Sequence, residues 1–248
     1  MTTAAAPDRT TRVAIVTGAA SGIGAAIARR LSHHGVRVVA LDRSEAVRDI
    51  AQEIGGRGLV GDITDAAFTA NAVELAQNTE GRLDILVNAA GIQHRTDAVD
   101  IDEDSWSRLL EVNLSAAYRL SRQSAKALAA THGCIVNIAS LSADRAVPGI
   151  VPYGATKAAL VQLSRGLAVE MGPDGVRVNA VAPGYIETPM TRDVLSQDEF
   201  RSRVLSRIPL RRLADGDDVA DVVVFLTSTA ARYVTGVVLP VDGGYSIT

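Results

Sequence analysis

The chain has 248 residues, of which 47% are hydrophobic and 21% charged, a composition that supports a sizeable folded core and argues against intrinsic disorder. The net charge is −3, from 25 basic and 28 acidic residues, and neither a basic arm nor a run of like charge suggests a nucleic-acid partner. No uninterrupted apolar stretch reaches the roughly 18 residues that a membrane-spanning helix needs, so we expect no membrane partner.

The opening residues and the cysteine content bear on location and on metals. Residues 1–11 are small and polar and lack the hydrophobic segment of a signal peptide, so we expect a flexible tail and a cytoplasmic protein. The single cysteine, Cys134, lies in an apolar run and excludes an internal disulfide or a cysteine-based metal site. Clusters of His, Asp or Glu with metal-ligand spacing are lacking as well, which predicts no metal cofactor.

Strands and helices alternate along the chain in the way expected of a parallel sheet. Short apolar strands are predicted at residues 12–17, 36–41, 58–61, 83–88, 134–139, 177–182 and 237–240. Helices are predicted at residues 22–31, 45–53, 66–77, 105–130, 153–171, 197–205 and 219–226. The strands lack polar alternation, as is typical of a sheet that is covered on both faces. We therefore expect an α/β fold over residues 12–248, a single doubly wound Rossmann domain with a seven-stranded parallel sheet and helices on both faces.

One segment interrupts this alternation. Residues 184–213 are longer than a usual connection between a strand and a helix, and they carry Pro189 and Pro209 as well as a short predicted helix. Long connections of this kind often cover a binding site, so we expect this segment to form a substrate lid.

A glycine-rich turn joins the first predicted strand to the first predicted helix. Gly18, Gly22 and Gly24 have the spacing GxxxGxG, with Ser21 and Ile23 between them. At this place in a parallel sheet, free backbone N–H groups and a helix N-terminus can bind a pyrophosphate, and glycine lets the anion approach the backbone. Glycines can also end a strand for steric reasons alone, but the position after the first strand favours a dinucleotide site.

The second predicted strand is followed by Asp42, 18 residues after Gly24. A carboxylate there can accept hydrogen bonds from the adenosine ribose hydroxyls, and it would repel a 2′-phosphate. Asp42 could instead cap the following helix, and the adjacent Arg43 could hold a 2′-phosphate. The charge of Asp42 favours NAD over NADP as the cofactor.

Tyr153 and Lys157 lie four residues apart in a predicted helix and therefore project from one face of it. A nearby positive charge stabilises a phenolate, so we expect Lys157 to lower the pKa of Tyr153 toward neutrality, where the phenol can exchange a proton with an alcohol. Lys157 is also one of only two lysines among the 25 basic residues, which suggests that this position requires an ammonium group. Taken alone, such a pair also occurs on solvated helix faces.

Further motifs occur in the order and spacing typical of one enzyme family. Residues 17–24 match a TGxxxGIG turn, residues 88–91 match an NNAG motif except at Ala89, and Ser140 precedes Tyr153 by 13 residues. The chain therefore resembles the short-chain dehydrogenase/reductases over nearly its whole length. This resemblance implies an oxidoreductase that transfers a hydride between a secondary alcohol or ketone and a nicotinamide cofactor.

The resemblance also implies roles for the matching residues. Tyr153 would be the acid/base, and Ser140 would hold and polarise the substrate oxygen. Lys157 would tune Tyr153 and anchor the nicotinamide ribose, while Asn113 would hold a water in a proton relay. The residues expected to bind the cofactor are Gly18, Ser21, Gly22, Ile23, Gly24, Asp42, Arg43, Asp62, Ile63, Asn88, Ala89, Gly91, Tyr153, Lys157, Pro183, Gly184, Ile186 and Thr188.

The residues that follow the shared motifs bear on the substrate. The segment from Gly91 to Arg95 resembles the gluconate 5-dehydrogenase and 2-deoxy-gluconate dehydrogenase branch, which implies a sugar, sugar acid or polyol as the small-molecule substrate. Arg95 could bind a carboxylate through two hydrogen bonds, or it could be an ordinary solvated residue. The residues expected to contact the substrate are His94, Arg95, Ser142 and Tyr185.

Two other functions stay open. The chain also resembles the 3-oxoacyl-(acyl carrier protein) reductases, which implies an NADPH-dependent 3-oxoacyl-thioester reductase, although Asp42 and Ser21 stand where such enzymes usually carry basic residues. A non-catalytic regulatory protein that binds a dinucleotide would have no need of Tyr153. The resemblance further implies a homotetramer, packed through the predicted helices at 105–130 and 153–171 and the region of the last strand.

Overall fold

The fold is taken from a computed structural model that describes residues 11–248. The tail predicted at residues 1–11 lies outside the described residues except for Thr11. Within the described part of the chain, seven strands form one sheet in the order β3-β2-β1-β4-β5-β6-β7. Every neighbouring pair in this sheet is parallel. The predicted α/β fold with a seven-stranded parallel sheet is thus confirmed.

The strands and helices lie close to their predicted positions. The strands are β1 (Val13–Thr17), β2 (Arg37–Asp42), β3 (Arg57–Val60), β4 (Ile85–Asn88), β5 (Cys134–Ile138), β6 (Arg177–Pro183) and β7 (Val238–Val241). The helices are α1 (Gly22–His33), α2 (Val47–Glu53), α3 (Ala66–Thr79), α4 (Glu103–Leu110), α5 (Ala116–Thr131), α6 (Val151–Met171), α7 (Arg192–Leu195), α8 (Asp198–Arg207) and α9 (Gly216–Thr227). Most predicted boundaries fall within about three residues of these bounds.

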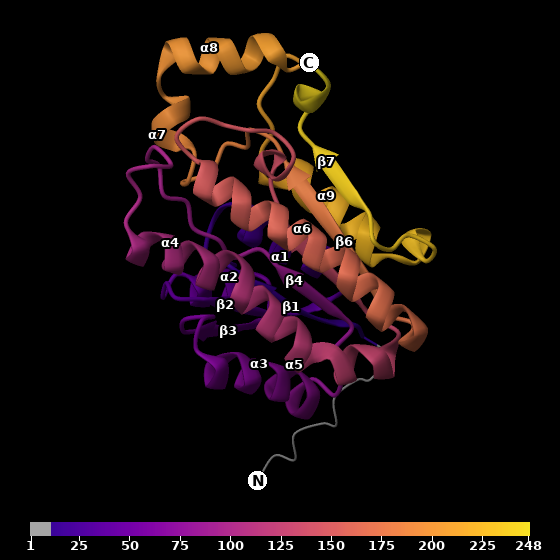
Figure 1. Cartoon of the computed structure of the whole chain (residues 1–248). Coiled ribbons are helices and arrows are strands. Elements are labelled where there is room, and N and C mark those ends of the chain that lie inside the picture. The colour runs from indigo at the N-terminus through magenta and orange to yellow at the C-terminus, as the bar shows by residue number, and fades with distance from the viewer. Residues whose placement is uncertain (1–10) are drawn as a thin grey trace.

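Helices cover both faces of the sheet (Figure 1). On one face α1, α2 and α9 bury a core that includes Ile27, Val136 and Val223. On the other face α3, α5 and α6 bury a second core that includes Leu86 and Leu120. Because the central strands of such a sheet are covered on both faces, they are largely apolar, with the buried residues Asn88, Asn137 and Asn179 as exceptions.

The direction of winding reverses between β1 and β4, which are neighbours in the sheet. The loops that follow these two strands meet at the carboxyl end of the sheet, where a ligand crevice is expected. Gly18, which follows β1, has a φ of +68°, and a Cβ there would lie 2.8 Å from the Cα of Ala90. The Thr17 hydroxyl accepts hydrogen bonds from the N–H groups of Ala89 and Ala90, each at 3.0 Å. A glycine and a threonine therefore hold the two loops against each other.

The single helix predicted at residues 105–130 is wrong in one respect. It is divided into α4 and α5 by a π-helical turn, Glu111–Ser115. Within this turn, Oδ1 of Asn113 accepts a hydrogen bond from the Ile92 N–H at 2.8 Å, and Nδ2 donates to the Ile92 carbonyl at 2.9 Å. Turns of this type are rare and concentrate at functional sites. The hydrophobic periodicity of the sequence did not predict this turn, because the turn occurs together with a contact to Ile92, which is distant in the sequence.

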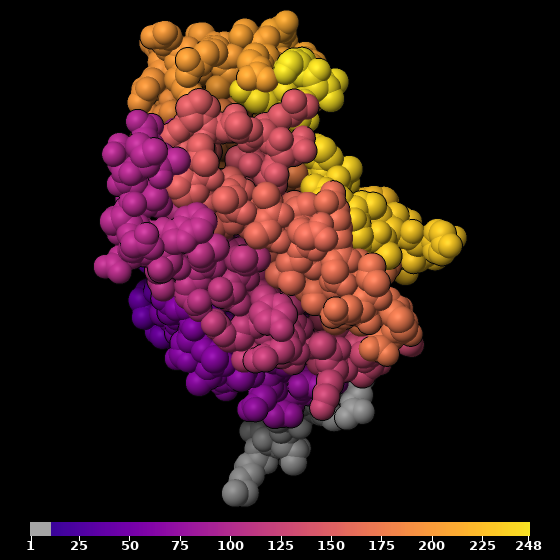
Figure 2. All heavy atoms as spheres, in the orientation of Figure 1, coloured from indigo at the N-terminus to yellow at the C-terminus, as the bar shows by residue number. Residues whose placement is uncertain are grey.

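The long segment at residues 184–213 carries α7 and α8, of which only α8 was predicted. Both helices lie at the carboxyl end of the sheet, and α8 ends beside the C-terminal segment (Figure 1). In the space-filling view the orange atoms of this segment and the yellow C-terminal atoms together form that end of the molecule (Figure 2). The apolar side chains that join them are Leu141, Leu195, Val204, Ile208, Leu213 and Tyr245.

Cys134 is free and buried in β5, and burial raises the pKa of its thiol to about 11. None of the helices within residues 11–248 is both long and apolar enough to cross a membrane. In the same residues, no group of three or more His, Cys, Asp or Glu side chains is placed to hold a metal ion.

Candidate active site

Two adjoining cavities lie where the strands end. The loops after β1, β2, β3 and β4 line the first, which has a volume of about 280 Å³. The loops after β4, β5 and β6, together with α8, line the second, of about 470 Å³. The residues that border both cavities are Ile23, Ala89, Gly91, Thr188 and Met190. A ligand could therefore extend from one cavity into the other.

The first cavity contains most of the residues predicted to bind the cofactor. They are Gly18, Ser21, Gly22, Ile23, Gly24, Asp42, Arg43, Asp62, Ile63, Ala89, Gly91 and Thr188. The Ser21 side chain does not cap α1, so the first N–H groups of this helix face the cavity without a partner inside the helix. A Cβ at Gly24 would overlap the carbonyl oxygen of Gly18. This cradle of small residues and free N–H groups fits a dinucleotide pyrophosphate.

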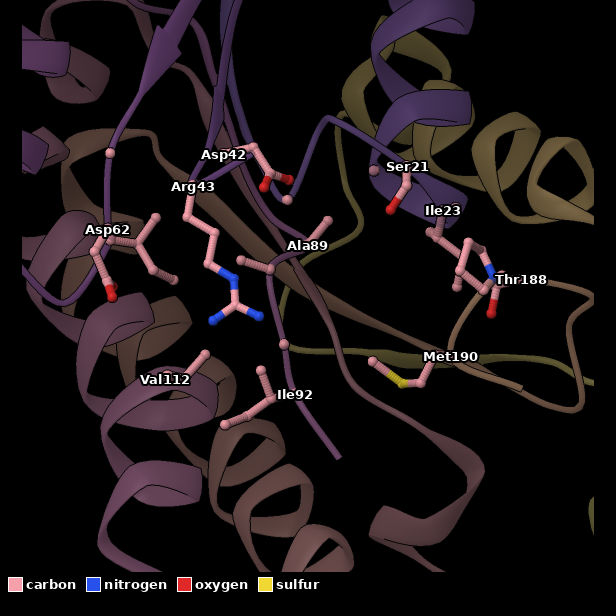
Figure 3. Close-up of a pocket in the computed structure, with 18 of the residues that line it drawn as sticks. Ser21, Ile23, Asp42, Arg43, Asp62, Ala89, Ile92, Val112, Thr188 and Met190 are labelled. Carbon is pink, nitrogen blue, oxygen red and sulfur yellow. The ribbon is translucent and has the colours of Figure 1, made fainter. Parts of the chain in front are cut away.

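Asp42 is held in this cavity by backbone groups. Its Oδ2 accepts a hydrogen bond from the Ala20 N–H at 3.1 Å, and its Oδ1 accepts one from the Ser44 N–H at 2.9 Å. The alternative interpretation of Asp42 as a helix cap is wrong, because α2 begins only at Val47. Arg43 extends from the end of β2 into the same cavity (Figure 3).

Asp62 forms an ion pair that the sequence did not reveal. Its Oδ2 accepts a hydrogen bond from Nη2 of Arg108 at 2.8 Å, and its Oδ1 accepts bonds from the N–H and hydroxyl of Thr64. Partial burial alone would raise the pKa of Asp62, but the hydrogen bonds from Arg108 and Thr64 outweigh it and lower the pKa to about 2. Arg108 also lines the cavity. It escaped prediction because α4 reaches Asp62 only in the folded chain.

The second cavity brings together three predicted catalytic residues, Ser140 at the end of β5 and Tyr153 and Lys157 in the first turns of α6. Tyr153 is 8% exposed and Lys157 3% exposed. The Ser140 hydroxyl oxygen accepts hydrogen bonds from the N–H of Ser142 at 3.2 Å and from its hydroxyl at 2.9 Å. Nζ of Lys157 donates to the Ile138 carbonyl at 2.8 Å and lies 5.7 Å from the centre of the Tyr153 ring.

The prediction that Lys157 lowers the pKa of Tyr153 is wrong for the side chains as they lie in this fold. Burial raises the pKa of Tyr153 to about 12, and the hydrogen bond with Ser140 opposes that rise only in part. Burial lowers the pKa of Lys157 to about 8. Both changes follow from desolvation, which penalises the charged form of each group. The lysine Nζ is bonded to the Ile138 carbonyl, and the phenol carries its proton at neutral pH.

Asn113 supports the site from behind and lines neither cavity. Besides its two bonds to Ile92, its Nδ2 donates to the Thr156 hydroxyl at 3.1 Å, which links the loop after β4 to α6. A Cβ at Gly91 would lie 3.3 Å from the Asn113 Oδ1 and 3.4 Å from Nζ of Lys157. The position of Lys157 therefore depends on a close approach of the backbone at Gly91.

Two predicted ligand contacts are not supported by the structure. Asn88 is buried, and its side chain donates to the Ser121 hydroxyl at 3.3 Å and to Oδ1 of Asn137 at 2.8 Å. His94 is exposed. Neither residue lines a cavity. Asn88 matches the family motif, but in this chain its side chain joins β4 to α5 and β5 instead of facing a ligand.

The second cavity also contains residues from the lid and the C-terminal segment. The predicted residues that line it, besides those already placed, are Arg95, Ser142, Pro183, Gly184, Tyr185 and Ile186. Arg203 and Arg207 of α8 and Tyr245 line it without having been predicted. The predicted helix at residues 197–205 contains Arg203 but ends before Arg207, so their common helix face became visible only because α8 extends to Arg207. For Tyr245 no local pattern existed.

Comparison with known proteins agrees with this geometry. The family model that matches, over residues 18–246, is a model of short-chain dehydrogenases and is described as enoyl-(acyl carrier protein) reductase. The chain belongs to the short-chain dehydrogenase/reductase family. It is therefore an oxidoreductase that acts on alcohol or ketone groups with NAD or NADP.

Three relatives illustrate the range within the family. The 4-formylbenzenesulfonate dehydrogenase of Comamonas testosteroni is 43% identical over 95% of this chain and 98% of that protein. A crystal structure from Beutenbergia cavernae, assigned as an NAD(P)-dependent gluconate 5-dehydrogenase with bound NADP, is 42% identical, with a TM-score of 0.91 and coverage of 96% of this chain and 97% of that one. The 3-ketoacyl-(acyl carrier protein) reductase of Brucella melitensis, complexed with NADH, is 35% identical, with a TM-score of 0.89 and coverage of 95% and 98%.

Proposed function

We propose that the protein is an NAD-dependent dehydrogenase of secondary alcohols in which Tyr153 exchanges the proton and Ser140 holds the substrate oxygen. The observation that carries this proposal is that buried Tyr153, buried Lys157 and half-buried Ser140 line one cavity, which adjoins the glycine-lined cradle. Buried polar groups of this kind, with shifted pKa values and in a cleft, are typical of catalytic sites.

In this proposal each side chain has one step. Bound nicotinamide supplies the hydride acceptor for oxidation and the hydride donor for reduction. In reduction Tyr153 donates its phenolic proton to the ketone oxygen, a role that suits a group whose pKa is raised to about 12. The Ser140 oxygen accepts two hydrogen bonds from Ser142, and its hydroxyl, which also reaches Tyr153, would turn its proton to the same ketone oxygen when a substrate is bound. In oxidation Tyr153 accepts the alcohol proton, which requires its phenolate.

In this proposal Lys157 and Asn113 exchange no proton with the substrate; Lys157 binds the cofactor and Asn113 holds the loop after β4 in place. The Ile138 carbonyl fixes the Lys157 ammonium beside Gly91, a residue that both cavities share, where it can donate to ribose hydroxyls. Asn113 holds the backbone of the preceding loop at Ile92. The predicted water at Asn113 is a further part of this proposal, since the side chain also reaches Thr156 and could extend a proton path away from Tyr153.

Asp42 supports NAD as the preferred cofactor. Its carboxylate is held by two N–H groups at the edge of the first cavity, where a 2′-phosphate would bring like charges together. Arg43 lines the same cavity and opposes this effect. We expect the ratio kcat/KM to be at least about tenfold higher with NAD than with NADP, measured under identical salt.

A sugar, sugar acid or polyol is the proposed substrate class, supported by similarity to the protein assigned as a gluconate 5-dehydrogenase. Similarity to the 3-ketoacyl-(acyl carrier protein) reductase supports an NADPH-dependent reductase of 3-oxoacyl thioesters as the second candidate. For either substrate, residues 184–213 would serve as the lid, because α8 supplies one wall of the second cavity.

The test is a turnover screen of the purified protein with both cofactors. Sugars, sugar acids, simple secondary alcohols and a 3-oxoacyl thioester are assayed through the absorbance of reduced nicotinamide. Oxidation of a hydroxy compound with NAD is the expected result. Preference for NADPH and the thioester would favour the second candidate. Binding of the dinucleotide without turnover of any alcohol or ketone would contradict catalysis and favour a regulatory protein.

We also propose a homotetramer formed through α5 and α6. Each helix exposes a large apolar side chain, Tyr118 at 46% on α5 and Val169 at 78% on α6. Apolar side chains on neighbouring exposed helices suit a contact between copies. Light scattering on the eluting protein should give four times the chain mass of 26.0 kDa, and a mass of one chain would contradict the proposal.

A further inference from the structure

The walls of the second cavity differ in charge from those of an ordinary polar pocket. Arg95, Arg203 and Arg207 contribute cationic side chains to its lining, and none of the lining residues is Asp or Glu. Lys157 adds a fourth basic group, but Nζ of Lys157 is bonded to the Ile138 carbonyl. The cavity is thus positively charged and lacks the carboxylate that would neutralise it from within.

Arg95 stands on the rim of the cavity on a fixed piece of chain. The N–H of the next residue, Thr96, donates to the Gly149 carbonyl at 3.0 Å. A Cβ at Gly149 would lie 3.9 Å from Cγ of Arg95, so the loop after β4 and the loop before α6 pack together there. Among residues 11–248, the Arg95 guanidinium has no hydrogen-bond or ion-pair partner. Its donors are available to a ligand.

Arg207 approaches from the lid and is oriented by the C-terminal segment. Its Nη1 donates to the Tyr245 hydroxyl at 2.9 Å, and its Nη2 donates to the Thr248 carbonyl at 2.8 Å. The guanidinium carbon lies 4.2 Å from the centre of the Tyr245 ring. A guanidinium has five N–H groups, so donors are left over for an anion.

Arg95, Arg207 and Tyr185 line the same cavity, and Arg207 donates to the hydroxyl of Tyr245, whose ring contacts that of Tyr185. Burial, together with the electrostatic influence of Tyr245 and a hydrogen bond to it, raises the pKa of Tyr185 to about 12. The positive charges of Arg95 and Arg207 act in the opposite direction and favour a negative charge at Tyr185, as their shared place in the cavity lining would lead one to expect. An anion near Tyr185 would therefore feel both guanidinium groups.

The remaining walls of the cavity are apolar and rich in aromatic rings. Tyr185 contacts Phe200 and Tyr245 edge to face, with ring centres 5.8 Å and 5.1 Å apart. The aliphatic side chains that complete these walls include Leu141, Val147, Val194 and Val204. Such surfaces bind a flat or apolar body and offer few partners for a row of hydroxyl groups.

We propose that the second cavity binds an alcohol or ketone with an apolar, planar body and a carboxylate, and that Arg95 and Arg207 recognise the carboxylate. This inference rests on the proposed dehydrogenase chemistry of the same site. For the substrate it replaces the sugar, sugar acid or polyol suggested by similarity with a more apolar compound, because the lining of the cavity is apolar and aromatic. The reacting carbon would lie beside Tyr153 and Ser140, while the carboxylate would lie between the loop after β4 and α8. A volume of about 470 Å³ accommodates a molecule of this size.

The test compares two aryl alcohols that differ in charge. The probes are para-(α-hydroxyethyl)benzoate and its neutral amide, para-(α-hydroxyethyl)benzamide, with gluconate as an anion that carries hydroxyl groups in place of an apolar body. With NAD, kcat/KM should be about tenfold to hundredfold higher for the benzoate than for the amide, as expected for a charge-assisted hydrogen bond. Gluconate should be the poorer of the two anions.

Variants of Arg95 distinguish direct binding of the carboxylate from a general effect of positive charge on anionic substrates. Arg95→Gln should raise KM for the benzoate about tenfold or more, change kcat little and leave the amide unaffected, whereas Arg95→Lys should restore part of the loss. The matched control is Arg192→Gln, which removes one exposed lid charge outside the cavity and should change neither probe. This pattern in KM would not arise from a purely structural role.

The outcomes that contradict the inference differ from those that contradict the proposed function. Equal kcat/KM for benzoate and amide, or an Arg95→Gln variant that affects both probes alike, would overturn the carboxylate site. Faster turnover of gluconate than of the benzoate would overturn the apolar body. Failure of every alcohol and ketone, with either cofactor, would overturn the proposed dehydrogenase itself.

Discussion

The cleft has a cofactor half, the first cavity, and a substrate half, the second cavity, and the two are lined by different kinds of groups. In the cofactor half the lining groups are mainly backbone N–H groups, glycines and two carboxylates, carried on the turns after β1, β2, β3 and β4. In the substrate half they are long side chains carried on a lid, two loops and the C-terminal segment. Backbone donors can bind only what every member of the family shares, a pyrophosphate and a ribose. Long side chains on loops can change the substrate without disturbing the sheet.

The same division separates the residues that bind the cofactor from those that carry out proton transfer. Tyr153 and Ser140 belong to the substrate half, while Asp42 and Gly24 belong to the cofactor half. If the two halves work independently, a substitution in the substrate half should lower turnover without changing NAD affinity. A substitution in the cofactor half should weaken NAD binding without removing the proton-transfer groups. The predictions below test this independence, beginning with the largest expected effect.

Removing the phenolic oxygen should abolish the chemistry alone. Tyr153→Phe should lower kcat by about a hundredfold to ten-thousandfold, because the proton donor is lost while the ring still packs in the cavity. Initial rates in both directions measure this effect. Tyr233→Phe, at a fully exposed tyrosine that lines neither cavity, is the matched control and should retain normal rates. Normal turnover by Tyr153→Phe would mean that another group moves the proton.

A methyl group in the cradle should damage the cofactor half. Gly24→Ala should weaken NAD binding by about tenfold to hundredfold, because the new Cβ would overlap the Gly18 carbonyl oxygen and displace the turn. Gly35→Ala, beyond the other end of α1, is the control. It has open space but a φ of +74°, so it should lower the free energy of unfolding by about 1 kcal/mol and leave NAD affinity unchanged. Calorimetric titration and thermal unfolding separate the two effects, and equal NAD affinities for both variants would contradict the cradle.

The pKa of Tyr153 predicts opposite pH dependences for the two directions. Because this pKa is raised to about 12, the phenol is protonated near neutral pH. Oxidation needs the deprotonated form, so kcat for the alcohol should rise with pH, by about tenfold per unit while the phenolate is the minor form. Reduction needs the protonated form of Tyr153, so kcat for the ketone should not rise with pH. Rates measured from pH 6 to pH 9 in roughly one-unit steps test this, and an oxidation rate that falls with pH would contradict Tyr153 as the base.

The smallest expected effect concerns cofactor choice. Asp42→Ala should raise kcat/KM with NADP relative to NAD by about fivefold to tenfold, because a negative charge near the 2′-phosphate is removed. Asp49→Ala removes an exposed charge on the neighbouring helix α2 and serves as the control. An unchanged preference in Asp42→Ala would mean that the adenosine ribose does not lie beside this carboxylate.

The cofactor half was the easier one to predict from the sequence, for a physical reason. A turn such as Gly18 to Gly24 is determined by residues close together in the chain, and so is the spacing of Tyr153 and Lys157 on one helix face. The seven parallel strands were predicted from the regular alternation of apolar strands and helices. These features depend on local geometry and periodicity, which a sequence displays directly.

The rest depended on contacts between distant parts of the chain. Arg108 meets Asp62 across 46 positions, and Arg207 meets Tyr245 across 38. The π-helical turn at Asn113 accompanies a contact with Ile92, so a regular helix was predicted instead. The pKa of Tyr153 had the wrong predicted direction because desolvation depends on burial in the complete fold.

The most direct test of the division between the two halves is a calorimetric titration of NAD into the wild-type protein and into Tyr153→Phe, paired with turnover of the same preparations. The cleft as described predicts the same dissociation constant within about threefold and a loss of turnover in the variant, since Tyr153 faces the substrate cavity. Loss of NAD binding together with loss of turnover, in a variant that is still folded, would contradict it.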